Sequence, residues 1–123
     1  MLIGKEDGSN VNVVPPGITG FGHRKKLYIS GPITNHPNYL TEFKAVEDRL
    51  RSMGFQPINP AKFISLLPID MEYERTMHIC YALIDVSDGI FMMQGWMKSR
   101  GAKLELEYAL KHNKPEYYEE FDL

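Results

Sequence analysis

From residue 26 onward, the chain alternates short apolar runs with longer stretches that mix apolar and polar positions. The run 27–30 predicts a buried strand, which ends at Gly31 and Pro32. Over 40–53, apolar residues recur every three or four positions, which is typical of a helix that packs one face on a core. We expect Leu40, Phe43, Val46, Leu50 and Met53 to point inward, and Glu42, Lys44, Glu47, Asp48 and Arg51 to face water.

The middle of the chain continues this alternation. Residues 55–60 contain two prolines and predict a short strand or an edge strand. Residues 61–69 are apolar without a clear period, and Asp70 can cap a helix that runs to about residue 84. The buried face of that helix is expected to carry Met77, Cys80 and Ile84.

A continuous apolar run over 89–93 predicts a central parallel strand that is covered on both faces. After a loop over 94–98, Ser99 can cap a last helix, which ends before Pro115. Residues 116–118 can add a final strand. The inward positions of the last helix are expected to be Ala102, Leu106, Ala109 and Leu110.

Strands that alternate with helices predict right-handed βαβ units and hence one α/β domain with a parallel sheet over residues 26–118. Residues 1–25 are rich in glycine and polar residues and are expected to form a flexible arm, although 12–14 could add an edge strand. The arm could also contact a partner. Residues 119–123 are expected to be an acidic tail.

Composition narrows the classes of function. A chain of 123 residues with 43% hydrophobic residues forms one domain, and a net charge of −2 disfavours binding to long nucleic acids. The single cysteine excludes a disulfide framework within the chain and a Cys-rich zinc site. No apolar run is long enough to span a membrane, and the first residues lack the layout of a secretory signal. We therefore expect a cytoplasmic protein.

Ligands of open parallel sheets bind beyond the carboxyl ends of the strands. Two segments follow the predicted strands there, 30–34 and 94–101, and they line one crevice if the strands are neighbours. The first loop contains neither Gly-x-Gly-x-x-Gly nor Gly-Lys-Ser/Thr, so a dinucleotide site and a P-loop are unsupported. The four histidines share no ligand spacing, and no metal is expected.

Glu105 is the first candidate for chemistry at this crevice. It lies near the start of the last helix, at the margin of its apolar stripe. The helix dipole would keep its carboxylate ionised there, and a partly desolvated carboxylate can attack a sugar carbon. The alternative is a solvated helix residue, paired with Arg100 or Lys103.

Further candidates surround Glu105. Ser99 and Gly101 can expose backbone N–H groups to an anion or a sugar oxygen, or Ser99 can serve as a cap alone. Tyr28 points to the opposite face from its strand neighbours and either touches a carboxylate or packs in the core. Trp96 either stacks on a base or covers the core, and Asp88 taken alone is a turn residue. The first loop adds Ser30, Gly31, Pro32 and Ile33 as candidate contacts.

Taken together, these segments resemble a known family. Residues 27–33 are similar to the first strand and loop of nucleoside 2-deoxyribosyltransferase-like proteins, and 99–105 to their Ser-x-Gly-x-x-x-Glu segment. The likeness is greatest to a phage-associated branch of unknown function, DUF4406, through the segments 28–32, 58–60 and 95–105. It covers about residues 26–118.

The resemblance implies a flavodoxin-like or Rossmann-like fold and cleavage or transfer at an N-glycosidic bond of a nucleoside or nucleotide. It implies that Glu105 attacks the anomeric carbon with support from Tyr28, and it assigns Asp88 to the substrate site. Ser99, Gly101, Gly31 and Pro32 would hold sugar hydroxyls or a phosphate. It further implies no metal or redox cofactor, and a homo-oligomer whose subunits complete each other's sites.

One position departs from the resemblance. Related hydrolases have an aspartate eight residues before the position of Asp88, where this chain has Cys80. A thiol is a poor replacement for a carboxylic acid in protonating a leaving base or activating water. Asp85 or Glu74 would have to serve instead, or the protein binds a nucleotide or nucleotide-sugar without turnover. A third hypothesis is an interaction module that works through the N-terminal arm.

Overall fold

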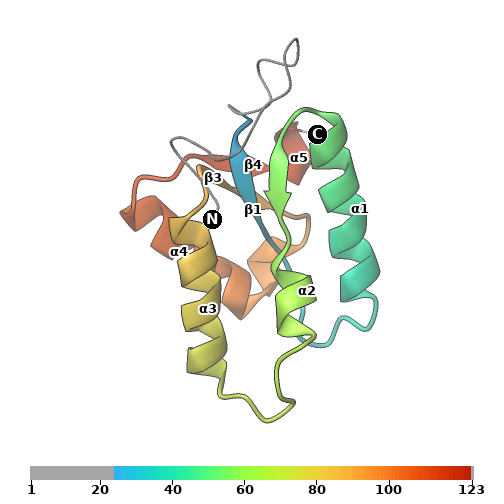
Figure 1. Ribbon diagram of the computed structural model, residues 1–123, viewed down its shortest axis with the longest axis vertical. Coiled ribbons are helices and arrows are strands. Elements are labelled where there is room, and N and C mark those ends of the chain that lie inside the picture. The colour runs from blue at the N-terminus through green and yellow to red at the C-terminus, as the bar shows by residue number, and fades with distance from the viewer. Residues whose placement is uncertain (1–23, 123) are drawn as a thin grey trace, which may run out of the picture.

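The computed structural model describes residues 24–122, so the expected N-terminal arm lies almost wholly outside the described residues. Four parallel strands form one sheet in the order β2-β1-β3-β4 (Figure 1). The strands are β1 (Lys26–Ser30), β2 (Gln56–Ile58), β3 (Gly89–Met92) and β4 (Glu116–Tyr118). The predicted α/β class, the edge position of the second strand and the central position of the third are confirmed.

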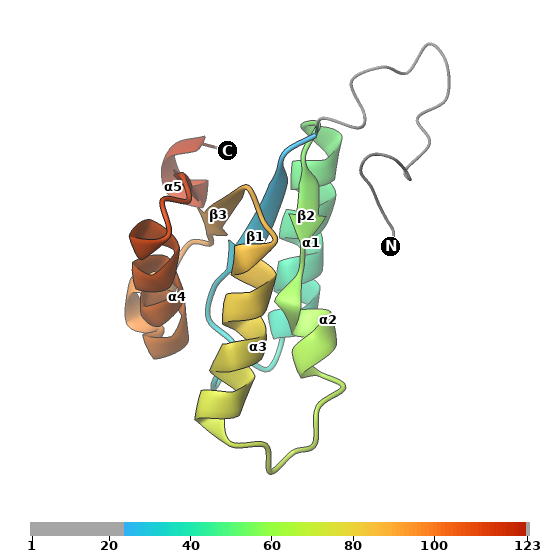
Figure 2. The same cartoon turned by 60° about the vertical axis from the view of Figure 1, so that its left-hand side comes forward.

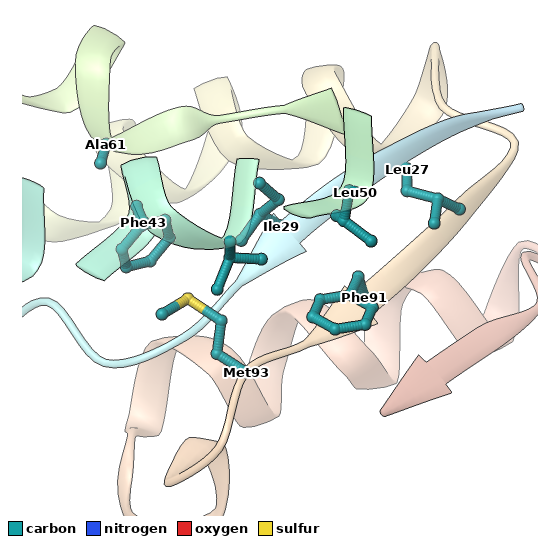
Figure 3. Close-up of a cluster of buried hydrophobic side chains, with 8 residues drawn as sticks. Leu27, Ile29, Phe43, Leu50, Ala61, Phe91 and Met93 are labelled. Carbon is teal, nitrogen blue, oxygen red and sulfur yellow. The ribbon is translucent and has the colours of Figure 1, made fainter. Parts of the chain in front are cut away.

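Helices cover both faces of the sheet (Figure 2). The helices of the domain are α1 (Tyr39–Ser52), α2 (Pro60–Ile64), α3 (Tyr73–Asp85), α4 (Arg100–Lys111) and α5 (Glu119–Asp122), with a 3₁₀ turn over Trp96–Lys98. Strand alternation divides β1 between two cores, because successive side chains point to opposite faces. Leu27 and Ile29 join Phe43 and Leu50 of α1 in one core (Figure 3), whereas Tyr28 faces α3 and α4 in the other.

Helix α1 follows the predicted period, with Phe43, Val46 and Leu50 buried. Leu40 and Met53, in the first turn and just after the last, are exposed, so their predicted inward positions are wrong. Glu47 was expected to face water and is instead buried.

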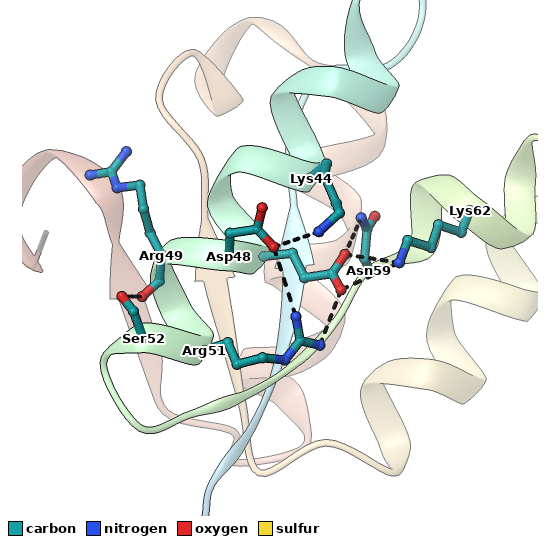
Figure 4. Close-up of polar contacts among 8 residues, drawn as sticks. Lys44, Asp48, Arg49, Arg51, Ser52, Asn59 and Lys62 are labelled. Atoms are coloured by element: carbon teal, nitrogen blue, oxygen red, sulfur yellow. Dashed lines mark hydrogen bonds and ion pairs between the residues drawn. The ribbon is translucent and has the colours of Figure 1, made fainter.

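Glu47 can be buried because its carboxylate is fully paired. Asn59 donates a hydrogen bond of 3.0 Å to Oε1, and Arg51 donates one of 3.1 Å to Oε2 (Figure 4). Lys62 adds an ion pair. Burial acts to raise the pKa of Glu47, but these bonds outweigh it and hold the pKa below its ordinary value.

Helix α3 starts two residues later than expected, at Tyr73. The backbone N–H groups of Arg75 and Thr76 donate to the carbonyl of Glu72, so Glu72, rather than Asp70, occupies the N-cap position. The predicted cap at Asp70 is therefore wrong. The expected inward residue Leu110 of α4 is also exposed, whereas Ala102, Leu106 and Ala109 are buried as predicted.

The segment expected to be an acidic tail begins with α5, which is tied to the domain. The carboxylate of Glu119 accepts a hydrogen bond of 2.7 Å from the backbone N–H of Gln94 and another of 3.1 Å from Arg49. These bonds join the C-terminal end of the described chain to the loop after β3 and to α1.

Candidate functional site

A cavity of about 770 Å³ opens beyond the carboxyl ends of β1 and β3. Its walls are the loop after β1 (residues 31–36), the first half of α3, and the start of α4 with the residues before it (98–102). Because β1 and β3 are neighbours, the two predicted loops meet at one crevice, as expected. The volume is within the range of small-molecule sites, about 300–1,000 Å³.

Glu105 lies in the wall of this cavity. It is only 7% exposed, because it shares the buried face of α4 with Ala102, Leu106 and Ala109. The alternative of a solvated helix residue is therefore wrong. A carboxylate in such a position must find hydrogen-bond donors, since an unpaired buried charge is very unfavourable.

Strand β1 supplies these donors. Ser30 donates a hydrogen bond of 2.6 Å from Oγ to Oε1 of Glu105, and Tyr28 donates one of 3.0 Å from its hydroxyl to Oε2. Both donors are fully buried and lie on the same face of β1, two residues apart. Both residues contact the carboxylate from the buried core, and neither of them lines the cavity.

Burial has the largest effect on the pKa of Glu105. Desolvation raises its pKa to about 7, although hydrogen bonds from Ser30, Tyr28 and Cys80 act to lower it. The expectation that the helix dipole keeps this carboxylate ionised is thus corrected. Near neutral pH the group can be either a proton donor or a nucleophile.

Cys80 of α3 also lines the cavity beside Glu105. Burial and the nearby charge of Glu105 raise the pKa of its thiol to about 12. The same two causes raise the pKa of Tyr28 well above its ordinary value. Both groups therefore stay protonated near Glu105, and neither adds a second charge to the site.

The start of α4 has the predicted cap, since Ser99 Oγ accepts a hydrogen bond of 3.1 Å from the backbone N–H of Ala102. Ser99 and Gly101 both line the cavity. A Cβ atom at Gly101 would lie 3.1 Å from the hydroxyl oxygen of Tyr73. The glycine thus makes room for this tyrosine.

Gly31, Pro32 and Ile33 line the cavity from the first loop, as expected. Gly31 has a packing reason of its own. A Cβ atom there would lie 2.6 Å from Sδ and 2.9 Å from Cβ of Met93, too close for any side chain.

The structure does not bring Asp88 or Trp96 to this cavity. Asp88 lies at the other end of the sheet, where its carboxylate accepts a hydrogen bond of 2.8 Å from the backbone N–H of Lys26. Trp96 packs on Tyr118, with ring centroids 5.9 Å apart, and covers the core next to β4. Within one chain, Asp88 and Trp96 therefore make structural contacts and do not form part of the cavity wall.

Sequence reasoning missed Tyr73, which lines the cavity one turn before Met77. The guanidinium of Arg100 lies 4.8 Å from the centre of its ring, and the Tyr73 hydroxyl has no hydrogen-bond partner among residues 24–122. The sequence did contain an indication of this position, because the spacing of Tyr73, Met77 and Cys80 places all three on one face of α3. Lys98 and His36 also line the cavity and were not predicted.

Between residues 24 and 122, no group of three or more His, Cys, Asp and Glu side chains is placed to hold a metal ion. Within the same range, no helix combines the length and the apolar character needed to cross a bilayer.

Comparison with solved structures gives a match to the 2-desoxiribosyltransferase from Leishmania mexicana, with a TM-score of 0.58 and 21% sequence identity. The match covers 76% of this chain and 63% of the other, so the present chain spans less than two thirds of that protein. At this identity the likeness establishes a shared fold. A search of curated proteins found no match.

Comparison of the sequence with models of protein families assigns the chain to a family. The model of the domain of unknown function DUF4406 matches residues 25–118. This range contains the whole sheet and each wall of the cavity described above. The chain therefore belongs to the DUF4406 family, with the fold of a deoxyribosyltransferase.

Proposed function

We propose that this protein cleaves or transfers at the N-glycosidic bond of a (deoxy)nucleoside or (deoxy)nucleotide, with Glu105 as the nucleophile. The observation that carries the proposal is a buried carboxylate in a cavity wall, both of whose oxygens are oriented by hydroxyl donors. The deoxyribosyltransferase fold supports the same reaction class.

In the proposed reaction, a carboxylate oxygen of Glu105 attacks the anomeric carbon of the sugar. The carbon–nitrogen bond breaks, its electron pair leaves with the base, and the base nitrogen takes up a proton from solvent water. A glycosyl ester on Glu105 results. Water, or a nitrogen of a second base, then attacks the same carbon, loses a proton, and releases the carboxylate.

The environment of Glu105 suits this role. Its hydrogen-bond donors are neutral groups, and no cation is among the causes that shift its pKa. A carboxylate that is paired with a cation is a weaker nucleophile, because the cation stabilises its charge. With a pKa of about 7, a large fraction of Glu105 is ionised at neutral pH.

A specific observation favours a second function, the binding of a nucleotide or nucleotide-sugar without turnover. Retaining glycoside chemistry uses two carboxyl groups about 5 Å apart, and Glu105 is the only carboxyl among the described residues that line the cavity. Cys80, with its pKa of about 12, is a poor acid. Asp85 is engaged by the hydroxyl of Tyr108, and Glu74 is exposed outside the cavity.

The experiment that separates the two functions is incubation with a panel of deoxynucleosides and deoxynucleotides, with free base measured by chromatography. We expect wild-type protein to release base and Glu105→Gln to lose at least 100-fold in rate, as nucleophile removal does. The matched control is Glu107→Gln, an exposed carboxylate of the same helix that pairs with Lys111.

Absence of release from every substrate, with folded protein, would contradict catalysis. Calorimetry then tests the alternative on the same panel. Binding that survives Glu105→Gln, with the ligand recovered intact, would support a binding protein.

A further inference from the structure

Ser30 was expected to be a ligand contact at the start of the first loop, but its hydroxyl has a partner within the protein. It is the last residue of β1, it is completely buried, and it is not among the residues that line the cavity. Its hydroxyl donates to Glu105 Oε1 at 2.6 Å, the shorter of the two hydrogen bonds from β1 to this carboxylate. Distances of this kind are typical of strong O–H···O⁻ bonds.

The backbone holds this hydroxyl in place. Ser30 pairs with Met92 in the β1–β3 ladder, and its carbonyl accepts a hydrogen bond of 2.8 Å from the backbone N–H of Met93. The next residue, Gly31, packs directly on the Met93 side chain. The backbone of Ser30 is therefore anchored on both sides of its Cα, which fixes the position of its Cβ relative to Glu105.

The other groups near Glu105 do not supply a positive charge. Tyr28 comes from β1, and Cys80, Tyr73 and Tyr81 come from α3; each of the four has a raised pKa and stays neutral near pH 7. Arg100 of α4, which lies over the ring of Tyr73, lines the cavity together with Lys98 and His36. None of these three cations or bases is among the causes that shift the pKa of Glu105. The ionised form of Glu105 thus depends on hydrogen bonds from neutral donors.

We propose that Ser30 is a positioning residue, whose hydroxyl fixes the orientation of the Glu105 carboxylate and stabilises its ionised form. Ser30 thereby sets the lower end of the pH range in which Glu105 can act as a nucleophile. The effect on reaction rate rests on the proposed function, whereas the effect on ionisation does not. Ser30 acts through Glu105 and is not itself a contact for the ligand.

The direct test is a carboxyl titration by NMR, with protein labelled with ¹³C at the glutamate carboxyl carbon. Glu105→Gln identifies the resonance. We expect Ser30→Ala to raise the pKa of Glu105 by about one unit or more, because a hydrogen bond to a charged group is lost. Ser30→Thr, which keeps the hydroxyl, should restore the wild-type titration.

Ser87→Ala is the matched control. Ser87 is also a buried serine, but its hydroxyl donates to the carbonyl of Leu83, away from the cavity. If Ser30→Ala does not fold, Ser30→Cys replaces it, since a thiol is a weaker donor and should give a smaller upward shift. An unchanged pKa of Glu105 in the folded variant would overturn the proposal.

Base release measured against pH gives the second readout. The acid limb of the Ser30→Ala profile should move to higher pH by the same amount as the titration, and the rate should recover well above that limb. A rate loss that is equal at all pH values would overturn the role in ionisation. A wild-type protein without activity would contradict the proposed function and leave the titration as an independent test of Ser30.

Discussion

The hydroxyl of Tyr28 lies 3.0 Å from Oε2 of Glu105, although the two residues are 77 positions apart in the chain. The contact joins the middle of the first strand to the second turn of the last long helix, across the core between β1 and α4. The carboxylate, itself buried, is thereby held where it faces the cavity.

The burial of Glu105 predicts an unusual pH dependence of stability. Because its pKa in the folded protein is about 7, above the ordinary 4.5, the folded state binds more protons than the unfolded state between these values. The free energy of unfolding should therefore fall as pH rises from about 4.5 to about 7, by an amount on the order of 3 kcal/mol.

Glu105→Gln removes this titration. Thermal unfolding at pH 5 and pH 8 should show that the stability of the variant, relative to wild type, is greater at pH 8. Glu107→Gln provides the control at an exposed position of the same helix. An identical pH dependence in wild type and Glu105→Gln would show that Glu105 titrates normally.

Cys80 should be unreactive in the folded protein. Its pKa of about 12 leaves almost no thiolate at pH 8, although it lines the cavity, and the thiolate is the reactive species. As the chain has one cysteine, labelling with iodoacetamide followed by mass spectrometry reports on this site alone. We expect fast labelling in urea and labelling at least 100-fold slower without it; comparable rates in a folded protein would contradict the burial of the thiol.

Gly31→Ala should destabilise the fold by about 1–3 kcal/mol, through overpacking against Met93. Met93→Ala in the same chain removes the Sδ contact at 2.6 Å but keeps the Cβ contact at 2.9 Å. The double variant should therefore show partial rescue in a double-mutant cycle of urea unfolding. Strict additivity of the two single changes would mean that the clash is absorbed elsewhere.

Asn59→Asp should destabilise the protein in a pH-dependent manner. Asn59 caps α2 by accepting a hydrogen bond of 2.9 Å from the backbone N–H of Ala61, and it donates to Glu47 at 3.0 Å. Aspartate keeps the cap but loses the donor, and it places a second negative charge beside Glu47. The loss of stability should be largest above about pH 5 and shrink as the carboxyls are protonated.

Asn59→Ser is the comparison for this prediction, because it retains a capping oxygen without adding charge. Its stability relative to wild type should change less between pH 4 and pH 7 than that of Asn59→Asp, because it loses the donor to Glu47 but adds no charge. Parallel pH profiles for the aspartate and serine variants would argue against charge repulsion at Glu47.

The sequence predicted the alternation of strands and helices well, because apolar periodicity reports directly on which faces are buried. The run 89–93 and the spacing over 40–53 each gave an element in the expected place. The errors fell where a local pattern competed with long-range contacts. Glu47 is polar at a position that turns inward, and only Asn59, Arg51 and Lys62, which converge on it, make its burial stable.

For the site, the sequence determined which residues could take part: Glu105, Tyr28, Ser99 and the first loop were identifiable from spacing and resemblance. Only the tertiary structure decided how they are arranged around the cavity. It showed that the Ser30 hydroxyl bonds to Glu105 and that Ser30 does not line the cavity. It also added Tyr73 to the cavity wall. The physical reason is that the ionisation of a carboxylate depends on its burial and its hydrogen-bond donors, and these come from residues distant in the chain.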